Sequence, residues 1–153
     1  GTASLDLMHS LITEHHGHSF ARKVSDWFMH TDFRPAAGPQ RAGLVERIGV
    51  TDQAILNAIE AMENHISDPL NLQDLSRIAQ VGERQLNRLF KNKLNISTMG
   101  YYRGLRLDLA QNLLRNSSLS VTESSLATGF SGSAHFSSCY SQKFGGPPSS
   151  QRR

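Results

Sequence analysis

Apolar residues recur at helical spacing along most of the chain. Residues 4–30 hold two such groups, each on one helical face and divided near Gly17, which predicts two helices. A third amphipathic segment has apolar positions at i, i+4, i+7 and i+11, namely Ile55, Ile59, Met62 and Ile66. Thr51 or Asp52 can cap this third helix, and we expect it to end before Pro69.

Two short amphipathic segments follow, separated by the turn Gln80-Val81-Gly82. The first begins at Asn71, a residue type that caps helices, and Asp74 lies near the positive end of its dipole. The second runs from Glu83 to Lys93 and buries one apolar side, formed by Leu86, Leu89 and Phe90. Two helices joined by so tight a turn are a helix-turn-helix unit, which we expect over about residues 71–94.

A longer helix is predicted from about Thr98 to Leu114, and a second pair of short helices follows it. The run Ser120-Val121-Thr122-Glu123 is a capping box that begins one helix, and another begins near Ser133. Three aromatic or apolar pairs lie 50 residues apart: Leu86 and Phe136, Phe90 and Tyr140, and Leu94 and Phe144. This offset indicates a repeated supersecondary unit. The predicted fold is all-α, with a second helix-turn-helix over about residues 120–145.

Prolines and glycines divide the chain near its first quarter. Pro35, Gly38 and Pro39 predict a linker, which we place at residues 34–49. The main domain is then expected at residues 50–153, after a separate N-terminal segment, residues 1–33.

Charge is distributed unevenly between the two halves. Residues 1–83 hold six Lys or Arg against eleven Asp or Glu, whereas residues 84–153 hold ten against two. Between Arg84 and Arg106 there are six basic residues and no acidic one. Such a surface is typical of a protein that faces a polyanion, although a solvated basic face accounts for the charge equally well.

The outward side of residues 83–93 carries the chemistry of base recognition. The second helix of a helix-turn-helix enters the major groove of DNA and meets base edges there. Arg donates two hydrogen bonds to guanine and Asn pairs with adenine in bidentate fashion, which favours Arg84, Asn87 and Arg88 as base contacts. Lys91 and Lys93 suit phosphates.

These segments together resemble a known family of DNA-binding domains. The run Leu86-x-Arg88-x-Phe90-Lys91 and the later Leu126-Ala127-x-Gly129-Phe130, His135-Phe136-Ser137 and Phe144-Gly145-x-x-Pro148 are similar to the AraC/XylS-type domain. The resemblance covers about residues 50–153 and implies seven helices, with the long helix linking two reading heads.

The same resemblance implies the remaining contacts with DNA. It places the base contacts of the second unit at Ser133, Ala134, His135 and Ser138. Further expected phosphate contacts are Gln85, Arg103, Arg106 and Lys143. The second unit departs from the family pattern, which often has basic residues at positions 138 and 141 and an aliphatic residue at 124, where this chain has serines. We therefore expect the first unit to carry most of the sequence discrimination.

The N-terminal segment has a resemblance of its own. Gly1 to Met8, His16-Gly17-His18, Ala21-x-x-Val24 and Arg34 are similar to the closing helices of a ThiJ/PfpI-type, amidotransferase-like domain. A subgroup of AraC-type regulators uses such a domain to sense small metabolites. The resemblance implies that residues 1–33 are two helices left from an upstream α/β domain, most of which is absent from this chain.

Enzymatic and metal-binding readings are weaker. His15, His16 and His18 point in different directions on a helix and lack a carboxylate or Cys at ligand spacing, so we expect no metal and no cofactor. Cys139 and His135 are spaced as a nucleophile and a base, yet Cys139 is better explained as a small apolar residue. With a single Cys and no apolar run long enough to span a membrane, the chain is expected in the cytoplasm.

The sequence thus predicts a non-enzymatic, sequence-specific transcription regulator that binds double-stranded DNA. We expect an activator that responds to a small-molecule effector, contacts RNA polymerase and can form a homodimer. The alternative is an adaptor whose basic face binds RNA or an acidic protein.

Overall fold

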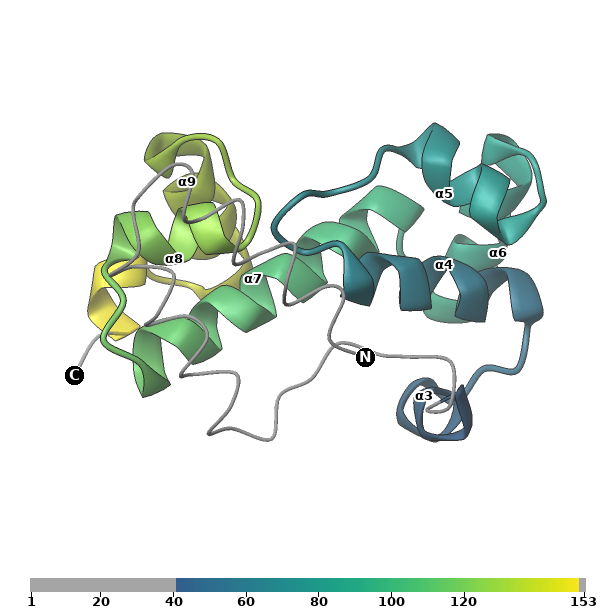
Figure 1. The fold of residues 1–153 in the computed structure, drawn as a ribbon, viewed down its shortest axis with the longest axis horizontal. Helices are drawn as coiled ribbons and strands as arrows, with labels where there is room; N and C mark the ends of the chain where they lie inside the picture. The colour runs from purple at the N-terminus through teal and green to yellow at the C-terminus, as the bar shows by residue number, and fades with distance from the viewer. Residues whose placement is uncertain (1–40, 152–153) are drawn as a thin grey trace. The chain divides into compact units, whose positions relative to one another are not determined.

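The computed structural model describes residues 41–151, in which helices are joined by turns and loops and no strand occurs (Figure 1). The helices are α3 (Arg41–Ile48), α4 (Gln53–Asn64), α5 (Leu72–Ala79), α6 (Glu83–Leu94), α7 (Thr98–Asn116), α8 (Val121–Ala127), α9 (Ser133–Phe144) and the 3-10 helix η2 (Pro148–Gln151). The prediction of an all-α fold with two helix-turn-helix units and a long intervening helix is confirmed. The two helices expected in residues 4–30 lie outside the described residues.

The described chain forms two compact units, and α7 contributes residues to both. The first unit contains residues 41–65 and 69–105, and the second contains residues 66–68 and 106–151. Within the first unit, α5 and α6 are the predicted helix-turn-helix, and within the second, α8 and α9 are.

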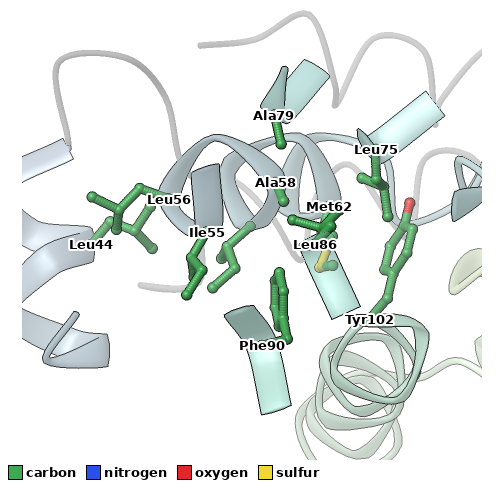
Figure 2. Packing of buried hydrophobic residues seen from close by; sticks show 11 residues of the cluster. Leu44, Ile55, Leu56, Ala58, Met62, Leu75, Ala79, Leu86, Phe90 and Tyr102 are labelled. Carbon is green, nitrogen blue, oxygen red and sulfur yellow. The ribbon is translucent and has the colours of Figure 1, made fainter. Parts of the chain in front are cut away.

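One apolar cluster holds α6 in the first unit. Leu86 and Phe90 of α6 are fully buried and share this cluster with Met62 of α4, Leu75 of α5 and Tyr102 of α7 (Figure 2). The positions i and i+4 face the same side of a helix, so burial of Leu86 and Phe90 leaves the opposite side of α6 to solvent.

The segment expected as a linker contains a helix that belongs to the first unit. Leu44 of α3 is buried against the α4 side of the same cluster (Figure 2). Arg47 of α3 donates to both carboxylate oxygens of Glu63, at 3.4 Å each. Burial raises the pKa of Glu63, and the charge of Arg47 opposes that rise. The predicted linker, residues 34–49, therefore includes the helix Arg41–Ile48, in which Leu44 covers an apolar surface of the first unit.

Side-chain caps begin three of the helices. Asp52 accepts a hydrogen bond from the N–H of Ala54 at the start of α4. Asn71 with Asp74 before α5, and Ser120 with Glu123 before α8, form complete capping boxes. The sequence predicted the second box, and for the first it predicted the Asn71 cap with Asp74 near the helix dipole.

The hydroxyl of Tyr102 forms hydrogen bonds with the backbone at both ends of the loop between α4 and α5. It accepts a hydrogen bond from the N–H of Leu70 at 3.0 Å and donates one to the carbonyl of His65. Through this fully buried side chain, α7 supplies hydrogen-bond partners for the backbone of two half-buried loop residues.

The second unit has a smaller core built largely from aromatic rings. The ring centroids of Phe130 and Phe136 are 5.1 Å apart, and those of Tyr140 and Phe144 are 4.5 Å apart with the rings tilted by 51°. Its helix α8 is polar on the buried side, where Ser124, Ser125 and Thr128 are each almost fully buried. The Ser124 hydroxyl has no hydrogen-bond partner among the described residues.

Comparison of the two units explains that buried serine. The caps Asn71 and Ser120 are 49 residues apart, which aligns Ser124 with Leu75, a fully buried core residue of the first unit. The glycine caps of the second helices, Gly82 and Gly132, are 50 residues apart, so the second turn is one residue longer. A hydroxyl therefore occupies the position where the first unit has an isobutyl side chain.

Candidate nucleic-acid interface

The outward side of α6 is an uncompensated basic surface. Arg84, Arg88 and Lys91 fall at i, i+4 and i+7 on the side opposite Leu86 and Phe90, and all three are exposed. Gln85 and Lys93 are exposed beside them. Within residues 41–151, no acidic side chain forms an ion pair with any of these four cations. Their charge is therefore available to an external anion.

Asn87 is placed differently from its cationic neighbours. Its side chain is half-buried, and its Oδ1 accepts a hydrogen bond from the backbone N–H of Thr98 at 3.1 Å. Thr98 begins α7 and is fully buried. Thr98 was predicted as the approximate start of the long helix, but no feature of the sequence indicated its bond to Asn87.

The two arginines of α7 that were predicted as phosphate contacts, Arg103 and Arg106, also differ from each other. Arg103 is exposed in the first unit, as a phosphate contact requires. Arg106 is half-buried in the second unit, where its Nε donates to the carbonyl of Thr128 at 2.8 Å. Its guanidinium also lies 4.2 Å from the centroid of the Phe130 ring. These two contacts tie Arg106 to the turn after α8, so it stabilises that turn in the free protein.

The outward side of α9 is nearly uncharged. The predicted base contacts of this helix, Ser133, Ala134, His135 and Ser138, are all exposed. The 50-residue offset aligns Ala134 with Arg84 and Ser138 with Arg88, so neutral residues replace both cations. The single basic residue of α9, Lys143, pairs with Asp108 at 3.5 Å.

The Cys139 and His135 side chains lie close together in the second unit. Cys139 Sγ is 3.4 Å from His135 Nε2, and the His135 ring packs 5.9 Å from that of Phe130. Within the described range, no three His, Cys, Asp or Glu side chains gather as metal ligands would. The same range contains no helix with the length and apolar character of a membrane span. His15, His16 and His18 lie outside it.

Comparison with known proteins places this pair of reading helices in a family. The model of a helix-turn-helix domain matches residues 75–153, which is more than half of the chain. The crystal structure of an AraC-type transcriptional regulator from Chromobacterium violaceum is 39% identical, with a TM-score of 0.62 over 65% of this chain and 88% of that one. The chain belongs to the AraC/XylS family. The family predicted from the sequence is confirmed, and with it the prediction that this domain is a DNA-binding transcription regulator.

Two curated relatives in the family match along the whole chain. The HTH-type transcriptional regulator GlxA of Rhizobium meliloti is 42% identical over 153 residues, 100% of this chain and 47% of its own. The HTH-type transcriptional regulator CdhR of Pseudomonas aeruginosa is 41% identical over 152 residues, 99% of this chain and 45% of its own. The similarity includes residues 1–40 and supports the resemblance to the AraC/XylS subgroup with a ThiJ/PfpI-type domain. The chain spans about half the length of these relatives.

Proposed function

We propose that this chain recognises a specific DNA operator chiefly through α6 of its first helix-turn-helix unit. The observation that carries the proposal is the contrast between the two second helices. Helix α6 presents Arg84, Arg88 and Lys91 without acidic partners in the described chain, whereas the only cation of α9 is paired with Asp108. Because cationic side chains bind phosphates strongly and arginine forms a bidentate contact with guanine, the first unit is the better equipped to read DNA.

The individual roles follow from exposure and side-chain chemistry. Arg84 and Arg88 are assigned to base edges in the major groove, where an arginine forms two hydrogen bonds with guanine. Phosphate contacts are assigned to four other exposed side chains of the first unit, Gln85, Lys91, Lys93 and Arg103. In the second unit Ser133, Ala134, His135 and Ser138 are assigned neutral contacts with bases, and Lys143 is assigned a phosphate contact in which Asp108 offsets part of its charge.

Regulation is proposed to come from an attached sensor domain. The similarity of residues 1–40 to full-length regulators supports a ThiJ/PfpI-type domain that binds a small-molecule effector. Together the two domains would form a transcription activator that contacts RNA polymerase, can dimerise and works in the cytoplasm. A regulator of this kind needs no catalytic step, and we infer that the chain is not an enzyme.

Selection from random duplexes tests the proposal and separates it from the adaptor alternative. The chain is expected to enrich one motif, and excess random duplex should not displace that motif at moderate salt, because specific complexes bind roughly 10³-fold or more tighter than non-specific ones. One well-defined box indicates reading by the first unit alone. Two equally defined boxes one turn apart would contradict the unequal roles, and enrichment of no motif, with tighter binding to RNA or to an acidic protein, would favour the adaptor.

A further inference from the structure

We propose that Asn87 is a positioning residue, which fixes the orientation of α6 against α7 and does not itself read a base. The inference rests on the proposed reading of DNA by α6. It concerns what holds Arg84 and Arg88 of that helix in position to contact DNA.

The bond between Asn87 and Thr98 joins two helices at a point that water does not reach. The acceptor is Asn87 Oδ1, the donor is the N–H of Thr98 at 3.1 Å, and Thr98 is 0% exposed. This N–H belongs to the first turn of α7, where backbone donors have no partner within the helix. Ser97 supplies a second such partner through its Oγ, which accepts from Gly100 at 3.1 Å. The start of α7 is therefore capped partly by its own loop and partly by α6.

The same bond occupies the atom that adenine recognition would need. A bidentate contact with adenine uses the amide oxygen of Asn as acceptor and its NH₂ as donor. In this structure the Asn87 amide is half-buried and turned toward α7. To present both amide atoms to a base edge, Asn87 would have to leave the buried Thr98 N–H without a partner.

Arg84 and Arg88 flank Asn87 at i−3 and i+1 on the same helix. A helix that is free to roll about its axis moves the tips of both arginines together, because long side chains amplify a small rotation. Together with the burial of Leu86 and Phe90, the bond to Thr98 fixes the rotation of α6 about its axis and thereby sets where both guanidinium groups meet the groove.

The second unit has neither partner of this bond. The 50-residue offset aligns Asn87 with Ser137 and Thr98 with Pro148, and proline has no backbone N–H to donate. The bond therefore occurs only in the unit whose second helix carries the uncompensated cations. This coincidence is expected if the bond serves recognition and is unexplained if it serves only the common fold.

Two substitutions of Asn87 separate positioning from base reading. N87D keeps an acceptor for Thr98 but loses the amide donor that adenine requires, whereas N87A loses both. S137A at the aligned position of the second unit is the matched control. Each variant is compared with the unmodified chain by base preference at every position of the selected motif and by hydrogen exchange of the Thr98 amide.

We expect N87D to retain slow exchange at Thr98 and the same base preference at every position, with a uniform loss of affinity from its added negative charge. N87A is expected to speed exchange at Thr98 and to weaken preference by roughly fivefold or more at the base pairs read by Arg84 and Arg88. S137A is expected to change neither readout.

Loss of preference at one base pair alone in N87D would overturn the proposal and make Asn87 a base reader, even if N87A does not fold. Unchanged exchange and preference in N87A would also overturn it. If the unmodified chain enriches no motif, the proposed function fails instead, and exchange of Thr98 still tests the bond.

Discussion

Ser124→Ala is expected to stabilise the second unit. The Ser124 side chain is 0% exposed, and its hydroxyl has no partner in the described part of the chain. Burial of a hydroxyl without a hydrogen bond costs about 1–3 kcal/mol, and a further ~0.5 kcal/mol comes from the lower helix propensity of serine. Removing the oxygen leaves the Cβ in place, so the substitution creates little new cavity. We expect the unfolding free energy of this unit to rise by about 1.5–3.5 kcal/mol.

Urea unfolding followed by circular dichroism measures the change, with NMR signals from α8 and α9 assigning the transition to the second unit. Ser138→Ala is the matched control, because Ser138 is an exposed serine inside a helix and reports helix propensity alone. The midpoint should shift upward in S124A with an unchanged slope. Equal shifts in the two variants, or destabilisation by S124A, would refute the reasoning.

Three further predictions concern the first unit. Tyr102→Phe leaves the N–H of Leu70 and the carbonyl of His65 without their partner, so urea unfolding should show a loss of about 1–3 kcal/mol; no loss would mean that water replaces the hydroxyl. Burial raises the pKa of Glu63 above its ordinary 4.5, so the folded protein binds this proton more tightly than the unfolded chain does. The unfolding free energy should therefore fall as the pH rises from the unfolded-state pKa of Glu63 through its folded-state pKa. Glu63→Gln should remove this fall and stabilise the first unit at pH values above the folded-state pKa of Glu63. A pH profile unchanged by the substitution would show that Glu63 is not the group responsible. Gln80 has a left-handed φ of 62°, so Gln80→Gly should raise the melting temperature through a gain of up to about 1 kcal/mol; a lower melting temperature would show that the Gln80 side chain matters more than its backbone.

Much of the fold follows from local rules that a single sequence displays. The predicted caps Asn71 and Ser120 begin their helices in the structure, and the apolar spacing of Leu86 and Phe90 identifies the buried side of α6. Spacing alone does not locate helix ends. Ile66 continues the apolar period of α4 and is buried, yet α4 ends at Asn64.

The interface was less predictable, because burial and partners depend on tertiary contacts. Composition indicated that Arg106 belongs to the basic surface, but the structure directs its guanidinium to Thr128 and Phe130. The chemistry of asparagine suited Asn87 to adenine, whereas the structure binds its oxygen to a residue eleven positions away. No periodicity marks a hydrogen bond between a side chain of one helix and the backbone of the next.

The central claim is that the first unit supplies most of the sequence discrimination, and one pair of variants tests it most directly. Arg88→Ala and His135→Ala remove exposed side chains from α6 and α9, and both are measured against the selected motif and against random duplex at the same salt concentration. We expect R88A to lose about 5- to 150-fold in specific affinity, equivalent to one bidentate guanine contact, and H135A to stay within about twofold of the unmodified chain. Intact specific binding in R88A together with its loss in H135A would contradict the account.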